Sequence, residues 1–159
     1  MNDVLRGATT TMVFLGVYDQ LLHRELGTER ATALQKEIML SLAKAQAGMI
    51  REQTGIQDFD LEAIDSVIPQ FMKETTGTVF ELTEKTPTRL SYHVGRCVMY
   101  ESSLMLGMEP DAIQARCSAT ATAYVDALLR ELNPNARLEV HQFRQSAAEP
   151  CVESIVISA

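Results

Sequence analysis

The chain has 159 residues, of which 46% are hydrophobic and 22% charged, and its formal net charge at pH 7 is −7. This acidic balance argues against nucleic acids and anionic membrane surfaces as partners, because both are bound through clustered Lys and Arg side chains. The apolar runs are far shorter than the roughly 20 residues of a membrane-spanning helix.

The first half of the chain predicts three helices, over residues 4–26, 29–54 and 60–75. Apolar residues recur there every three or four positions, which is the period of a helix. Gly27 and Gly55 follow the first two helices, where a glycine commonly ends a helix. The second helix carries its apolar residues on one stripe: Ala31, Leu34, Ile38, Leu42, Ala45 and Met49.

The third helix is expected to contain Pro69, which lacks a backbone N–H and clashes with the preceding turn. We therefore expect a kink or a break near Val67. Its inward side chains are predicted to be Leu61, Ile64, Val67, Ile68 and Phe71.

The period changes to two after residue 77, which is typical of strands. Residues 78–83 and 88–94 predict one hairpin, and residues 138–143 and 151–158 predict a second. In the first hairpin, the alternation places Leu90, Tyr92 and Val94 on one face, and Arg89, Ser91 and His93 on the other. Two helices, over residues 98–106 and 110–132, are expected between the hairpins.

The predicted fold class is α+β in a single domain, with a helical part over residues 1–75 and a sheet-and-helix part over residues 76–159. Short connections can join only antiparallel strands, so the two hairpins predict a four-stranded antiparallel sheet that brackets two helices. The helices are expected to pack on one face of this sheet.

Cys97 and Glu101 are the strongest candidates for catalytic residues. Their spacing of four places them on the same face of a helix. A thiol beside a carboxylate can attack an electrophilic carbon and move a proton. A carboxylate disfavours the thiolate, however, so Arg96 or the helix N-terminus would have to lower the thiol pKa. The alternative is a buried structural Cys97 beside a solvated Glu101.

Two more cysteines could line the same site. Cys117 lies on the stripe of its helix with Ile113 and Leu128, which favours core packing and also suits a pocket wall. Cys151 shares a strand face with Glu153 and with two isoleucines. If those isoleucines point inward, a thiol and a carboxylate are buried together. The alternative is a two-sided strand with an exposed Glu153.

No metal or other cofactor is expected. Cysteines combined with His93 or His141 would suit zinc, but their spacing matches no known zinc module. Three cysteines in unlike elements give no disulfide framework, and we expect all three to be reduced and unpaired. Since no basic segment followed by an apolar core opens the sequence at Met1, we also expect a cytoplasmic location.

The region from about residue 94 to 157 resembles the L-2-amino-thiazoline-4-carboxylic acid hydrolase family. The resemblance rests on the run Arg96-Cys97-x-x-Tyr100-Glu101, on Leu106-Gly107, Cys117 and Asn133-Pro134, and on Cys151 before an apolar strand. The family usually has a proline after the first cysteine and an aspartate a few residues after the second. Here these places hold Val98 and the segment 118–122, with Asp126 as the nearest aspartate. The closing hairpin is also weakly similar to the 4-vinyl reductase domain, a small-ligand-binding module.

The resemblance implies a small hydrolase that opens a cyclic isothiourea or amidine-like substrate at a C–N or C–S bond. The alternative is a non-catalytic module that binds a small molecule in the same pocket, and a thiol-ligated metal site is a third alternative. The partner is then a small molecule, and the oligomeric state is open, with a homo-oligomer among the alternatives. An anionic substrate needs a cation, for which Arg96 or Arg89 is the candidate. The predicted substrate-binding residues are His93, Arg96, Tyr100, Cys117 and Cys151.

Overall fold

The computed structural model describes residues 3–158, so residues 1, 2 and 159 of the predicted domain lie outside the described part. Three helices make up the N-terminal half: α1 (Asp3–Leu26), α2 (Thr28–Thr54) and α3 (Leu61–Thr76). The helix α3 is continuous across Pro69, so the sequence-based expectation of a break is wrong. The carboxylate of Asp60 caps α3 by accepting a hydrogen bond from the backbone N–H of Ala63 at 2.9 Å.

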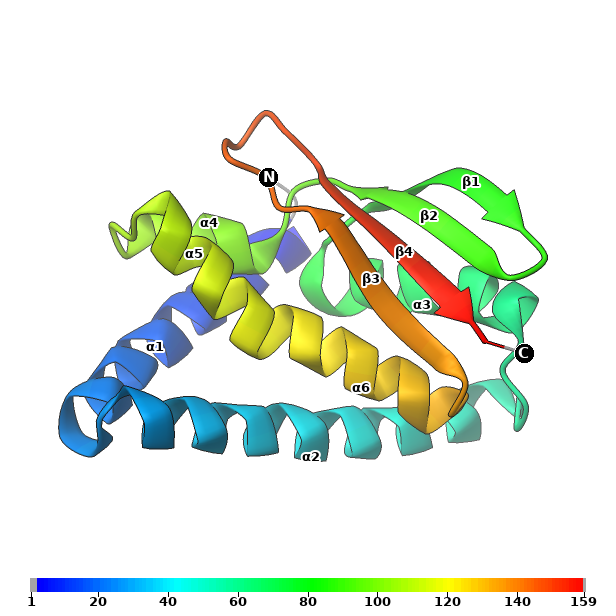
Figure 1. Cartoon of the computed structure of the whole chain (residues 1–159), viewed down its shortest axis with the longest axis horizontal. Coiled ribbons are helices and arrows are strands. Elements are labelled where there is room, and N and C mark those ends of the chain that lie inside the picture. Colours follow the sequence, from blue (N-terminus) through cyan, green and yellow to red (C-terminus); the bar gives the residue numbers. More distant parts are fainter. Residues whose placement is uncertain (1–2, 159) are drawn as a thin grey trace.

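Four strands form one antiparallel sheet in the order β1-β2-β4-β3, which confirms the predicted α+β fold (Figure 1). The strands are β1 (Phe80–Thr86), β2 (Arg89–Val94), β3 (Ala136–Gln142) and β4 (Cys151–Ile157). Each hairpin pairs its own strands, and β2 pairs with β4 to join the hairpins.

Between the hairpins, the chain forms α4 (Val98–Met105), then α5 (Pro110–Cys117) and α6 (Ala123–Leu132). A π-helical turn, η1 (Ser118–Thr122), joins α5 to α6, and its first and last residues have right-handed helical dihedral angles. The single helix expected over residues 110–132 is therefore one helical rod with a wide turn in its middle.

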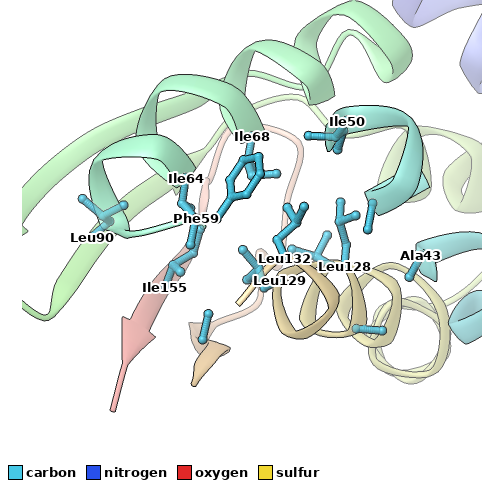
Figure 2. Close-up of a cluster of buried hydrophobic side chains, with 14 of the residues drawn as sticks. Ala43, Ile50, Phe59, Ile64, Ile68, Leu90, Leu128, Leu129, Leu132 and Ile155 are labelled. Atoms are coloured by element: carbon cyan, nitrogen blue, oxygen red, sulfur yellow. The ribbon is translucent and has the colours of Figure 1, made fainter. Parts of the chain in front are cut away.

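The main core lies between the sheet and helices α2, α3 and α6. Figure 2 shows side chains from these elements pointing toward one another around Phe59, which precedes α3. As predicted, Leu90, Tyr92 and Val94 of β2 are on the buried face of the sheet. Of the residues expected to point inward from α3, Leu61, Ile64 and Ile68 are buried and the other two pack against the core.

Most of the apolar stripe of α2 does not enter this core. Helix α2 packs against α6 through an adjacent face, on which Ala43 and Ala47 are fully buried. Small side chains let two helices approach closely. Helix α2 therefore packs against α6 through the face with Ala43 and Ala47, although these residues are less hydrophobic than those of the stripe. The larger residues Leu34, Ile38 and Leu42 are 37%, 47% and 42% exposed.

A membrane-spanning helix would have to be both long and apolar. Within residues 3–158, no helix meets both conditions.

Candidate functional site

Three thiols from three different elements meet at one small cavity, which we call the cysteine cavity. Cys97 immediately precedes α4, Cys117 ends α5, and Cys151 begins β4. The cavity has a volume of about 20 Å³, roughly the space of one water molecule. Its wall is completed by residues of α4, α5 and the β3–β4 connection: Tyr100, Ile113, Gln114, Phe143 and Arg144.

The sheet register explains why two of these cysteines are neighbours. Val94, the last residue of β2, pairs with Cys151, the first residue of β4. The chain then needs only Gly95 and Arg96 to reach Cys97 at the start of α4. Cys117 joins them because the small cluster around α4 packs its side chain together with that of Cys97. Cysteines far apart in sequence are thus brought together by strand pairing and helix packing.

Two thiols of the cavity, those of Cys97 and Cys117, are held in their neutral form. Burial raises the pKa of the Cys97 thiol, while the backbone amides of Tyr100 and Met99 and the charge of Arg144 act in the opposite direction. The pKa of Cys117 is raised to about 12, chiefly by burial, and the neighbouring Cys97 and Cys151 act in the same direction. All three cysteines are free.

Glu153 is a partly buried carboxyl group close to the thiols. It is paired with Tyr92 across the sheet and lies on the same inward face as Cys151. Burial raises its pKa to about 7, and the positive charge of Arg144 partly opposes that shift. A carboxyl group with a pKa near neutrality can exchange a proton under ordinary conditions.

Arg144 supplies the positive charge of the site and is only 6% exposed. Its Nη2 donates hydrogen bonds to the carbonyl oxygens of Val94, at 2.6 Å, and Gly95. Its guanidinium carbon lies 5.3 Å from the ring centroid of Tyr100, within the range of a cation–π contact. Its Nε is buried and has no hydrogen-bond partner among the described residues.

Arg96 and Glu101 form an ion pair beside the cavity and are absent from its wall. Nε of Arg96 donates to Oε1 of Glu101 at 2.7 Å. That hydrogen bond lowers the pKa of Glu101. The carboxylate is therefore ionised and engaged by Arg96, whereas the sequence predicted that it would serve the Cys97 thiol.

A second cavity of about 370 Å³ lies under the β3–β4 connection, and Arg144 lines both cavities. His93 and Arg96 line this larger cavity and do not line the cysteine cavity. Arg89 lies farther along the outer face of the sheet, where its Nη2 donates to Glu139 at 3.1 Å. Neither Arg96 nor Arg89, the two cations expected to bind an anionic substrate, lines the cysteine cavity.

Of the residues predicted from sequence, Cys97, Tyr100, Cys117 and Cys151 meet at one cavity, and their roles stay predictions. The residues that sequence reasoning missed are Ile113, Gln114, Phe143 and Arg144. Ile113 lies one turn before Cys117 and follows from the helical period. Arg144 lies in a polar connection between strands, and nothing in its sequence context distinguishes it from a solvated arginine.

The remaining residues that could bind a metal ion do not lie together. Asp126, the aspartate nearest in sequence to Cys117, accepts a hydrogen bond from the backbone N–H of Leu138 and pairs with Arg130. Within the described chain, no three His, Cys, Asp or Glu side chains are arranged to hold a metal ion.

No protein-family model matches the chain, and no curated protein sequence is recognisably similar to it. Among the solved structures that share its fold are two that are described with a bound small molecule. One is a trafficking protein particle complex subunit 3 from Naegleria fowleri covalently bound to palmitic acid, with a TM-score of 0.66 and 10% identity over 96% of each chain. The other is the phenol-responsive sensory domain of the transcription activator PoxR with phenol, with a TM-score of 0.63 and 13% identity over 92% of this chain and 74% of that one.

Proposed function

We propose that this protein is a binding module for a small, largely apolar molecule, which it holds at the cysteine cavity. The observation that carries the proposal is the convergence of three free thiols, an aromatic ring and a buried arginine at one cavity. Ligand sites are typically apolar concavities with a few polar groups that fix orientation.

The structural neighbours support this choice of function. One is described with palmitic acid and the other with phenol, so both are described with a small molecule that has a large apolar part. At these identities the likeness concerns the fold, and its extension to a ligand of this chain is part of our proposal.

The volume of the cavity sets a condition on binding. About 20 Å³ admits one water molecule, so a benzene ring or an acyl chain requires lining side chains to move. Phe143 is partly exposed and lies in the connection after β3. We propose that this residue moves when the ligand enters.

Isothermal titration calorimetry with phenol and palmitate tests the proposal. The wild type should bind at least one of the two, and Cys117→Leu, which fills the cavity, should weaken that binding by about tenfold or more. Ser118→Leu places the same side chain on the exposed neighbouring residue and should leave binding unchanged. Equal binding by wild type and Cys117→Leu would show that the ligand lies elsewhere.

Hydrolysis of a cyclic isothiourea is the second candidate. The observation in its favour is that the amides at the start of α4 and the charge of Arg144 both favour a thiolate at Cys97. The net shift still favours the thiol, and Glu101 is engaged by Arg96, so we rank it second. Turnover of 2-amino-thiazoline-4-carboxylate by the wild type, lost in Cys97→Ala, would reverse this order.

A further inference from the structure

We infer that the ligand of the cysteine cavity carries an anionic group, a carboxylate in the simplest case, and that Arg144 binds this group. The inference rests on the proposed binding function and names the chemical class of the ligand. It starts from the unusual state of the Arg144 side chain, which is charged, buried and incompletely paired.

Among the described residues, no carboxylate accepts a hydrogen bond from Arg144. Its two backbone acceptors, Val94 and Gly95, are neutral carbonyl groups, and Nε has no acceptor. Among the described residues, no carboxylate forms an ion pair with it. Glu101 is bound to Arg96, and Glu153 interacts with Arg144 electrostatically, without a hydrogen bond.

Such a state is unfavourable for a protein on its own. A buried charge costs several kcal/mol unless it is paired, and a buried N–H without an acceptor adds to that cost. A carboxylate binds a guanidinium group through short, charge-assisted hydrogen bonds. A ligand with a carboxylate would pair the buried charge of Arg144 and supply an acceptor for its N–H groups. A purely apolar ligand would leave that charge unpaired.

The position of Arg144 also sets the orientation of the ligand. Arg144 lines the cysteine cavity and also lines the larger cavity of about 370 Å³. The anionic group of the ligand lies at Arg144, and the apolar part extends toward the three thiols, Tyr100 and Ile113. This is the role that the sequence analysis assigned to Arg96 or Arg89.

The test compares two ligands of the same chain length, octanoate and 1-octanol, by calorimetry at neutral pH, where octanoate is ionised. The wild type should prefer octanoate by about tenfold or more, which is the range expected for a charge-assisted contact. In Arg144→Gln the preference should disappear. Arg96→Gln, which removes the other arginine of the larger cavity, should keep it.

The outcomes separate this inference from the proposed function. If neither probe binds, the binding function itself fails. If both bind equally to the wild type, or if Arg144→Gln keeps the preference, binding stands and the anion contact is overturned. If Arg144→Gln does not fold, equal binding of the two probes by the wild type still overturns the anion contact, and Arg144→Lys serves as the second variant, in which the octanoate preference should be lost.

Helix α2 exposes a continuous apolar surface on the side away from α6. We propose that two copies of this chain associate through the apolar stripe of α2, defined by Leu34, Ile38, Leu42, Ala45 and Met49. The stripe spans 16 residues, or roughly 22 Å of helix from the first to the last of them. All five residues are exposed, and Figure 1 shows α2 at the lower edge of the molecule with α6 on its inner side.

The charges beside the stripe argue for a second copy as its occupant. Glu37 and Lys44 are exposed, are seven residues apart and therefore lie on one flank of the stripe. Neither has an ion-pair partner within the described chain. In an antiparallel pair of identical helices, a two-fold axis between residues 40 and 41 places Glu37 of each copy opposite Lys44 of the other. The surface is therefore complementary to itself, as a two-fold interface requires.

Sedimentation velocity tests this inference. The wild type should sediment with twice the mass of the 17.6 kDa chain, and Ile38→Glu should be monomeric. Leu40→Glu is the matched control, because Leu40 is equally exposed, at 48%, on the opposite side of α2. Glu37→Lys should weaken the dimer, and the added Lys44→Glu should restore it. A monomeric wild type, or equal loss of mass in Leu40→Glu, would overturn the proposal.

Discussion

At the scale of single residues, the site is defined by side chains whose pKa values or hydrogen bonding differ from those of solvated groups. Two thiols are held neutral by burial, one carboxyl group has a pKa near 7, and one buried arginine has an Nε without a hydrogen-bond partner among the described residues. Each of these states costs folding free energy, because each group would be better solvated in the unfolded chain. Such groups concentrate at functional sites more often than elsewhere.

Glu153 should make the folded protein less stable as the pH rises. Its pKa is raised from 4.5 to about 7, so the folded state holds the proton more tightly than the unfolded state between these values. The free energy of unfolding should therefore fall from pH 4.5 to 7 and stay low above pH 7. At about 1.4 kcal/mol per pKa unit, the fall is at most about 3 kcal/mol.

Urea unfolding of Glu153→Gln across this pH range checks the expectation. The variant lacks the titrating group, so its stability should vary less with pH and should exceed that of the wild type at pH 8. Glu131→Gln, at an exposed glutamate, should keep the wild-type pH dependence. Identical pH dependence in Glu153→Gln and wild type would contradict the assignment.

The thiols of Cys97 and Cys117 should react slowly in the native protein. The thiolate is the nucleophile, and the raised pKa of each thiol leaves little of it at pH 7.5. Alkylation by iodoacetamide, followed for each cysteine by mass spectrometry, should be much slower in native than in urea-unfolded protein. Unfolding without reductant should expose three thiols per chain. A Cys97 that reacts equally fast in both states would show that the thiol is not held neutral.

At the scale of secondary-structure elements, the connections between helices carry strict conformational requirements. Gly55 and Gly77 end α2 and α3 with φ angles of 74° and 72°, which favour glycine. Gly77 has a second constraint, because an added Cβ would lie 2.8 Å from the backbone of Leu5 in α1. Gly55 has no atom within 4 Å of such a Cβ.

The pair Gly77→Ala and Gly55→Ala separates backbone strain from close packing. Both substitutions should cost about 1–2 kcal/mol of unfolding free energy for the left-handed conformation. Gly77→Ala should cost a further 1–3 kcal/mol or so, because α1 must move away from the end of α3. Equal losses in thermal or urea unfolding would mean that α1 adjusts without cost.

The elements themselves were largely predictable, because their signals are local. The alternation in residues 88–94 and the helical period around residues 60–75 each come from the side that faces the core. Boundaries were less accurate: β1 begins at Phe80 and continues to Thr86, beyond the predicted residues 78–83. The last residues of β1 pair with β2 after a register shift that follows Leu82, and no sequence pattern predicts this shift.

The site was predictable only in part, since its members meet through tertiary structure. Cys97 and Cys151 become neighbours through the β2–β4 pairing, which joins the two hairpins and has no local signal. Arg144 could not be identified, because burial of a charged residue depends on what the rest of the fold places around it. Glu101 was assigned to Cys97 by helical spacing, whereas its charge is engaged by Arg96, its partner five residues earlier.

At the scale of the whole molecule, the sheet presents two chemically different faces. The inner face carries Leu90 and Ile155 into the core, while the outer face carries a polar network. In that network, the hydroxyl of Ser154 lies 2.9 Å from both Ser91 Oγ and His141 Nε2. The cysteine cavity lies at the end of this sheet, where the hairpin connection meets α4 and α5. It is therefore bordered by the packed core and by a connection that has few core contacts.

The π-helical turn η1 between α5 and α6 has the geometry that results when one residue is inserted into a continuous α-helix. A π turn holds one more residue than the α-helix it interrupts, so the helices before and after it keep the relation of an uninterrupted rod. Removal of one residue such as Ala119 would then restore a regular helix, with Cys117 still at the cavity and Leu128 still in the core. The same deletion at Ala127 would rotate Leu128, Leu129 and Leu132 by about 100° relative to the preceding helix. The rod formed by α5, η1 and α6 thus has a position at which it can change length without losing its orientation, and this position adjoins a thiol of the site.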